Sequence, residues 1–231
     1  MTTKTVLFDL DGTLLNTLGD IADAINHAMR ALSHPEKTDA EVLAAIGNGI
    51  RRAIATVLPG IPSTSEINAA HSIFNEKYYE CYMNKTQPYP GILEILQTLR
   101  RHNYKIAVIS NKPDLYTCGL IEKHFGALVD ATAGERPGVP LKPAPDAVLS
   151  IISKVGGDPA NTVYVGDSEV DVATAKNAGI PCVLVSWGFR SRDTLLRVIA
   201  ESESESNGNP YPIILTDNAN ETLSAILNLL L

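Results

Sequence analysis

Two carboxylates near the start of the chain are the first residues that could do chemistry. Asp9 and Asp11 follow a short apolar run, Val6 to Phe8, and one residue separates them. Because alternate side chains of an extended chain point to the same side, both carboxylates can face one site, and Gly12 permits a tight turn directly afterwards. Such a pair can supply a nucleophile and a general acid/base. Alone, the pair is equally consistent with aspartates that form a turn or cap a helix.

A second carboxylate pair lies far along the chain. Asp167 and Asp171 are four residues apart across a predicted junction between a strand and a helix, which brings them near each other. Three or four carboxylates that converge repel one another unless a cation lies among them. Oxygen-only ligands favour a hard cation, and Mg²⁺ is the natural one beside a phosphate group. The sequence therefore predicts Mg²⁺ as cofactor, although Asp167 with Ser168 could also simply cap the next helix.

Groups that could bind phosphate oxygens lie between the two pairs. Ser110 and Asn111 come directly after another apolar run, and Lys142 precedes a predicted helix. The loops that follow parallel strands meet at one edge of the sheet, so these residues are expected beside the carboxylates. The Ser110 hydroxyl and the Lys142 ammonium would then hold phosphate oxygens. Each also has a structural interpretation, as a turn or a solvated lysine, but the whole set in chain order favours one site.

The elements that must position these residues follow from the hydrophobic pattern. Short apolar runs alternate with segments of helical periodicity, which predicts an α/β fold with a Rossmann-like parallel sheet and helices on both faces. The predicted strands are Val6–Phe8, Ile106–Ile109, Leu128–Ala131, Val163–Val165, Val183–Val185 and Ile213–Leu215. The predicted helices between them are Ile92–Arg101, Asp114–His124, Pro143–Val155, Val170–Ala178 and Ala219–Leu229.

A small all-α domain is predicted as an insert after the first strand. Residues 16–87 show helical spacing with Pro and Gly punctuation, and Ser63 with Glu66 forms a capping-box pattern, so four helices are expected. The α/β core would then comprise residues 1–15 and 88–231.

Two polar segments lie outside these elements. Gly47, Asn48 and Gly49 fall between two predicted helices of the insert, where they form either a simple turn or a loop that reaches over the predicted site. The segment from Glu201 to Asn209 is rich in Ser and Glu and of low complexity. That composition predicts a mobile surface loop.

The bulk composition limits the location and the partners of the protein. Of 231 residues, 45% are hydrophobic and 19% are charged, as in proteins that bury a core. The formal net charge of -7 argues against a general nucleic-acid or membrane-surface binder, because both partners are polyanionic. The 3 cysteines are far apart, and neither a signal peptide nor a segment of transmembrane length is present. We therefore expect a cytoplasmic protein with reduced thiols, as a monomer or a homodimer.

Four motifs of the chain resemble those of the haloacid dehalogenase-like hydrolases. In order, they are Phe8–Leu14, Ser110–Asn111, Lys142–Pro143 and Gly166–Asp171. The first and fourth motifs are specific, and the other two are weak signals alone. They come in the order of the family and span nearly the whole chain, and the helical insert sits where family members carry a helical cap. The resemblance thus implies a family-type core with this cap.

Within the family the chain looks most like the phosphoglycolate phosphatases. The supporting segments are Ile46–Gly49, Ser110–Pro113, Lys142–Asp146 and Ser186–Phe189. The segment from Arg190 to Leu215, with its Ser- and Glu-rich stretch, departs from the usual pattern. The resemblance therefore implies a phosphatase of a small metabolite, with 2-phosphoglycolate as the favoured substrate.

The resemblance also implies roles for individual residues. Asp9 would be the nucleophile that forms an aspartyl-phosphate, and Asp11 the general acid/base. The Asp9 carboxylate, the backbone carbonyl of Asp11 and Asp167 would bind Mg²⁺. Asp171 would support the metal either through a bound water or by contacts with these ligands. Ser110, the backbone amide of Asn111 and Lys142 would bind the phosphoryl group. In the cap, Gly47, Asn48, Gly49 and Arg51 would recognise the organic part of the substrate.

Several alternatives share part of this pattern. A sugar-phosphate mutase of the β-phosphoglucomutase type has all four motifs and a helical cap. A signalling receiver domain also uses an acceptor aspartate, but it is shorter and lacks the insert. A catalytically silent binding protein would not need the intact motifs. A dehalogenase is disfavoured because Asp11 is present, and a phosphonate hydrolase because the insert lysines, Lys37, Lys77 and Lys85, lie outside the Gly47–Gly49 loop.

Overall fold

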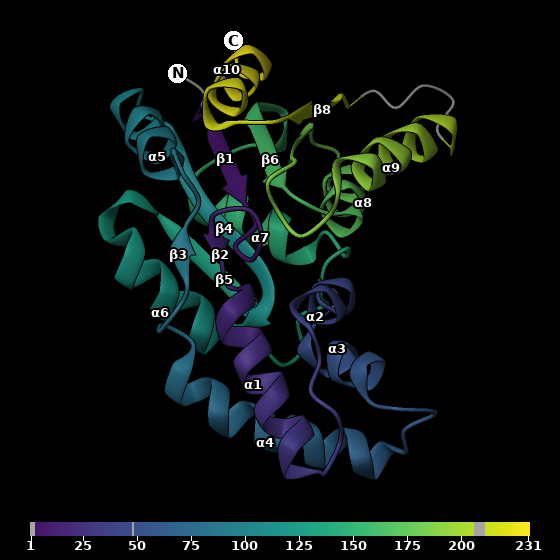
Figure 1. Ribbon diagram of the computed structural model, residues 1–231. Helices are drawn as coiled ribbons and strands as arrows, with labels where there is room; N and C mark the ends of the chain where they lie inside the picture. Colours follow the sequence, from purple (N-terminus) through teal and green to yellow (C-terminus); the bar gives the residue numbers. More distant parts are fainter. Residues whose placement is uncertain (1–2, 48, 206–210) are drawn as a thin grey trace. The chain divides into compact units, whose positions relative to one another are not determined.

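The computed structural model describes residues 3–47, 49–205 and 211–231, and the chain divides into two compact units (Figure 1). One unit comprises Met1–Leu15 and Pro88–Leu231, and the other comprises Asn16–Gln87. The chain passes between the units at two short strands, β2 (Leu15–Asn16) and β3 (Gln87–Pro88), which pair with each other.

The larger unit is built on a six-stranded parallel sheet with the strand order β5-β4-β1-β6-β7-β8. The strands are β1 (Thr5–Phe8), β4 (Lys105–Pro113), β5 (Ala131–Glu135), β6 (Thr162–Gly166), β7 (Cys182–Val185) and β8 (Ile213–Thr216). All residues of β1 are buried, which is why this central strand appears in the sequence as an unbroken apolar run. The predicted α/β fold class is confirmed.

Helices cover the sheet. They are α5 (Ile92–Arg101), α6 (Asp114–His124), α7 (Asp146–Lys154), α8 (Glu169–Ala178), α9 (Arg192–Glu205) and α10 (Ala219–Leu229). On one face, buried side chains of α7, α8 and α9 form a single core with alternate strand residues such as Leu7, Tyr164 and Leu184. Because neighbouring strand residues point to opposite faces, Val6 and Phe8 are buried on the other side.

The smaller unit consists of four helices among its described residues, α1 (Leu18–Ala31), α2 (Asp39–Ala45), α3 (Ile50–Val57) and α4 (Thr64–Cys81). The capping box predicted at the start of α4 is present, since the Ser63 hydroxyl accepts a hydrogen bond from the Glu66 backbone N–H. Asp20 of α1 is fully buried, and its carboxylate accepts hydrogen bonds from the backbone N–H groups of Lys85 and Thr86. Asp20 therefore ties the end of this unit to its first helix.

One predicted strand is displaced. The apolar run Leu128–Ala131 predicts a strand there, but Gly126–Leu128 is a 3-10 turn and the strand is Ala131–Glu135. Asp130 is the reason, because its backbone N–H donates to the carbonyl of Ile106 and its carboxylate accepts from the Ile106 N–H. Pairing with β4 continues from Ala131, through small residues that carry a weak strand signal.

Two further expectations are wrong in part. Helix α7 begins at Asp146 and not at Pro143, since the Pro-Ala-Pro sequence before it disfavours helical geometry at the residues that precede each proline. The Ser- and Glu-rich segment was expected to form a loop, yet Glu201–Glu205 ends α9, whose Leu195 is fully buried. The rest of that segment lies outside the described residues. Nowhere in the described chain is a helix long and apolar enough to cross a membrane.

Candidate active site

The predicted site residues of the larger unit gather at the carboxyl ends of three central strands. Phe8 at the end of β1 is in register with Val108 of β4 and Val165 of β6. Asp9 follows at once, and its backbone N–H donates to the Val165 carbonyl at 2.9 Å. Asp167 follows β6 directly, so the parallel register of β1 and β6 brings Asp9 and Asp167 to the same edge of the sheet.

A buried lysine lies at the centre of this edge. The Lys142 ammonium donates to Asp9 Oδ1 at 2.7 Å and to Asp171 Oδ1 at 2.9 Å. The side chains of Lys142 and Asp171 are 5% and 0% exposed. The Tyr164 hydroxyl completes the cluster, since it lies 3.1 Å from Lys142 Nζ and donates to Asp171 Oδ1 at 3.0 Å. Lys142 thus places one positive charge between two buried carboxylates.

Asp171 is held by the start of its own helix. Its Oδ2 accepts hydrogen bonds from the backbone N–H of Asp167 at 3.2 Å and from the Ser168 N–H and hydroxyl at 3.1 and 2.6 Å. These contacts form the N-terminal capping box of α8. Ser168 is therefore the N-cap residue, a structural role that the sequence left open for Asp167 with Ser168, and Asp171 combines the capping box with its ion pair to Lys142.

Asp167 lies in a cradle made by backbone. Its Oδ2 accepts from the Phe189 N–H at 2.6 Å, and its Oδ1 accepts from the Thr13 hydroxyl at 3.4 Å. A Cβ atom at Gly12 or at Gly188 would collide with the Asp167 side chain. Gly12 also has a φ of +89°, which disfavours any other residue. The glycine after the Asp9–Asp11 pair is thus required both for the turn and for the close approach of Asp167.

Three of these carboxylates form a group that fits a divalent cation. One oxygen each from Asp9, Asp167 and Asp171 lies within 4.8 Å of the others, and all three residues are buried. Buried oxygen ligands suit a hard cation such as Mg²⁺. Both Asp171 oxygens already accept hydrogen bonds, from Lys142 and from Ser168, which fits a supporting role for this residue.

The electrostatics of the group also favour a cation. Burial raises the pKa of Asp9 to about 7, because the Lys142 ammonium offsets only part of the lost solvation and Asp171 adds a like charge. Burial, together with the negative charges of Asp171 and Asp9, raises the pKa of Asp167 well above its usual value. Burial opposes ionisation of Asp171 too, but Lys142 and the hydrogen bonds outweigh it and lower the pKa. A divalent cation here would favour the ionised forms.

Asp11 contacts Lys112, which lies in the segment Ser110–Pro113 but to which the sequence assigned no role. Its Oδ1 accepts from Lys112 Nζ at 2.8 Å, and the two side chains are 20% and 6% exposed. Strand β4 continues past Ser110 to Pro113, so Lys112 follows the same two-residue alternation as Ser110. Its backbone N–H donates to the Ser110 hydroxyl at 3.2 Å. A longer strand prediction would have revealed Lys112.

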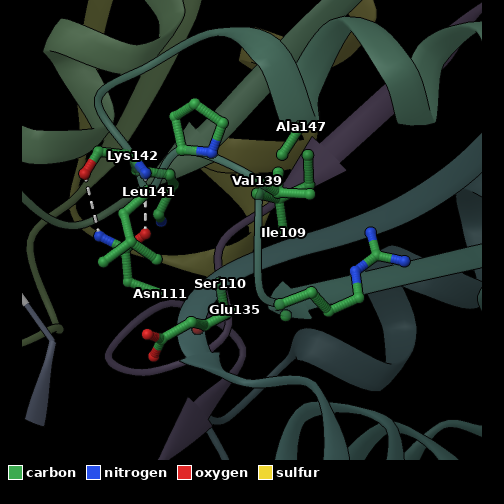
Figure 2. A pocket seen from close by; sticks show the side chains of 11 residues that line it. Ile109, Ser110, Asn111, Glu135, Val139, Leu141, Lys142 and Ala147 are labelled. Carbon is green, nitrogen blue, oxygen red and sulfur yellow. Dashed lines mark hydrogen bonds between the residues drawn. The ribbon is translucent and has the colours of Figure 1, made fainter.

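Asn111 holds the loop that carries Lys142. Its Oδ1 accepts from the Lys142 backbone N–H at 2.8 Å, and its Nδ2 donates to the Lys142 carbonyl at 3.1 Å (Figure 2). The Asn111 side chain thus positions Lys142, and the phosphate contact predicted for the Asn111 backbone amide stays a prediction. A small pocket lies beside these two hydrogen bonds. The residues that line it are Ile109, Ser110, Asn111, Gly134, Glu135, Arg136, Val139, Pro140, Leu141, Lys142 and Ala147.

The remaining predicted residues belong to the helical unit. Gly47 and Gly49 have φ values of +119° and +85°, and Gly49 precedes α3, where Arg51 is exposed in the first turn. Asn48 lies outside the described residues. Gly47 and Gly49 lie between α2 and α3, as the sequence predicted, and Arg51 lies within α3.

The comparison with protein families decides the assignment. The model of the haloacid dehalogenase-like hydrolases matches residues 6–185, which include both carboxylate pairs, Ser110 and Lys142. The chain belongs to this family. The resemblance inferred from the four motifs is therefore confirmed, and the protein is a hydrolase.

Individual relatives of this hydrolase indicate its reaction class. A phosphoglycolate phosphatase from Mesorhizobium japonicum is 32% identical over 201 residues, covering 83% of this chain and 86% of the relative. Phosphoglycolate phosphatase 1 from Pseudomonas aeruginosa is 31% identical over 227 residues, covering 95% and 78%. A crystal structure of a candidate phosphoglycolate phosphatase from Lactobacillus delbrueckii subsp. bulgaricus has a TM-score of 0.85 and 30% identity, covering 98% of this chain and 99% of that chain. The prediction of a phosphoric monoester hydrolase is confirmed at the level of this class.

Proposed function

We propose that this hydrolase is a Mg²⁺-dependent phosphatase that cleaves 2-phosphoglycolate through an aspartyl-phosphate on Asp9. The observation that supports this most is the arrangement of Asp9 and Asp11. Asp9 Oδ1 is bound to the buried ammonium of Lys142, and Asp11, two residues later, is paired with the ammonium of Lys112. The two neighbouring carboxylates thus have separate cationic partners and lie in different environments, which supports separate roles for them in one reaction.

In the first step, an oxygen of the Asp9 carboxylate attacks phosphorus and the bond from phosphorus to the ester oxygen breaks. Asp11 gives its proton to that leaving oxygen, which departs as an alcohol. Lys142, the Ser110 hydroxyl and the Asn111 backbone amide bind the phosphoryl oxygens while negative charge shifts toward the leaving oxygen. The Asn111 side chain keeps Lys142 in place for this, through its two bonds to the Lys142 backbone.

In the second step, Asp11 takes a proton from water, and the oxygen of that water attacks the phosphorus of the aspartyl-phosphate. The bond between phosphorus and the Asp9 oxygen breaks, which releases inorganic phosphate and restores the Asp9 carboxylate. Asp9, the Asp11 backbone carbonyl and Asp167 would hold Mg²⁺, supported by Asp171. When bound, Mg²⁺ supplies positive charge to the phosphoryl oxygens and to the nucleophile.

The choice of substrate comes from the relatives. Both curated relatives described above are named phosphoglycolate phosphatases, and the chain covers most of their length. The helical unit would act as the cap that excludes water and recognises the organic part of the substrate, through Gly47, Asn48, Gly49 and Arg51. The cytoplasmic location and the monomeric or homodimeric state stay predictions.

A substrate panel tests the proposal. Phosphate release from 2-phosphoglycolate, hexose phosphates and pyrophosphate should be greatest with 2-phosphoglycolate, and excess EDTA should abolish it until Mg²⁺ is restored. Asp9→Asn should lose activity on every substrate, with Glu122→Gln on the exposed side of α6 as the matched control. Full activity of Asp9→Asn would disprove the nucleophile, and conversion of β-glucose 1-phosphate to the 6-phosphate would identify a mutase instead.

A further inference from the structure

Lys112 is one of only two buried cations in the described part of the chain, and the mechanism above gives a role only to the other. Both Lys112 and Lys142 have 8% of their surface exposed, while the remaining described lysines and arginines are more exposed. Burying an ammonium group is costly unless it is paired, so a buried lysine calls for a reason. Lys112 Nζ contacts Asp11 Oδ1 at 2.8 Å, which places its charge beside the general acid and not beside the nucleophile.

The position of Asp11 locates the substrate atoms nearest to Lys112. A general acid must lie within hydrogen-bonding distance of the oxygen that it protonates. Lys112 Nζ is 2.8 Å from Asp11 Oδ1, and either oxygen of that carboxyl group can carry the proton, so the ammonium and the leaving oxygen are at most about 8 Å apart. A substituent on that oxygen would therefore lie within reach of Lys112, whereas the transferred phosphoryl group would lie by Lys142 and Asp9.

We propose that Lys112 is a specificity-determining residue that binds an anionic substituent one carbon away from the leaving oxygen. The substrates favoured by such a contact are phosphate esters of 2-hydroxy acids, in which a carboxylate follows that carbon. The inference rests on the proposed function and deepens it, because it places recognition of the carboxylate on β4 of the α/β unit. A neutral substituent beside Lys112 would also be desolvated, but it would form no ion pair with the ammonium to offset that cost.

A crossed comparison of substrate charge and enzyme charge tests this role. The native protein and Lys112→Gln are each assayed with 2-phosphoglycolate and with phosphoglycolamide, its neutral amide, in saturating Mg²⁺. For the native protein we expect kcat/KM to be roughly 10- to 100-fold lower with the amide, the value of one hydrogen bond to a charged group. For Lys112→Gln we expect the two substrates to differ by less than about 3-fold. Lys154→Gln, which removes an exposed charge from α7, should behave like the native protein.

The outcomes separate this inference from the proposed function. If the native protein hydrolyses both substrates equally well, or if Lys112→Gln keeps the native preference, the inference is wrong while the phosphatase function stands. An equal loss on both substrates would also overturn it, since that result assigns Lys112 to positioning Asp11 alone. If the native protein cleaves no phosphate ester, the proposed function itself has failed. If circular dichroism shows that Lys112→Gln does not fold, Lys112→Arg replaces it and must keep the preference for 2-phosphoglycolate over the amide. The native protein must also show that preference, and the inference is wrong if either protein lacks it.

Discussion

The raised pKa of Asp9 leads to a measurable dependence of stability on pH when Mg²⁺ is chelated. In the folded chain the pKa is about 7, against 3.8 for the ordinary group. Between these values the unfolded chain has lost the proton while the folded chain retains it. Unfolding then releases a proton, so the stability that Asp9 contributes is present at low pH and is lost as pH rises toward 7.

The size of the effect follows from the shift. Each pH unit between the two pKa values changes the free energy of unfolding by about 1.4 kcal/mol. From pH 5 to pH 8 the native protein should therefore lose roughly 2.5 kcal/mol more stability than Asp9→Asn, which has no carboxyl group to ionise at that position. The lowered pKa of Asp171 acts below pH 3.8 and the raised pKa of Lys142 above pH 10.5, so neither contributes in this range. The raised pKa of Asp167 changes stability in the same direction as that of Asp9, but Asp167 is present in both proteins, so the comparison with Asp9→Asn measures the part due to Asp9.

Urea unfolding in excess EDTA, followed by circular dichroism at pH 5, 6, 7 and 8, measures the difference directly. Glu122→Gln removes an exposed carboxylate from α6 and should follow the native curve. Mg²⁺ should stabilise the native protein more at pH 8 than at pH 5, because it binds the ionised carboxylates. A constant difference between native protein and Asp9→Asn across the four pH values would refute the account of Asp9 as a desolvated carboxyl group.

Three further substitutions have definite expected outcomes. Lys142→Met should destabilise the protein by roughly 3–5 kcal/mol, because it leaves two buried carboxylates unpaired, and adding Asp171→Asn should restore part of the loss in urea unfolding. Gly12→Ala should reduce stability by roughly 1–3 kcal/mol and weaken stabilisation by Mg²⁺ in thermal unfolding, since the new methyl group collides with Asp167. Asn111→Ala should lower kcat on 2-phosphoglycolate by roughly 10- to 100-fold, because two hydrogen bonds to the Lys142 backbone are lost, and an unchanged kcat would contradict that positioning role.

Much of the fold could be predicted because each of its elements carries a local signal. The central strand β1 is buried on both faces and appears as an apolar run, and helix α6 was predicted with its observed bounds, Asp114–His124. Strand β5 was misplaced because its register is set by Asp130, whose partners lie on β4 and α5. Helix α9 was missed because the burial of Leu195, a tertiary property, outweighs a weak and polar sequence pattern.

For the site, the sequence by itself determined which groups meet. A parallel sheet collects its strand ends at one edge, so the chain order of Asp9, Ser110 and Asp167 already implied a common location. Only the tertiary structure decided how these groups are paired, because an ion pair depends on side-chain distances between segments far apart in the chain. Lys142 proves to bridge Asp9 and Asp171, and Asp11 to have its own cation. That second cation, Lys112, is 101 positions away from Asp11 in the sequence, which is why no local pattern joined them.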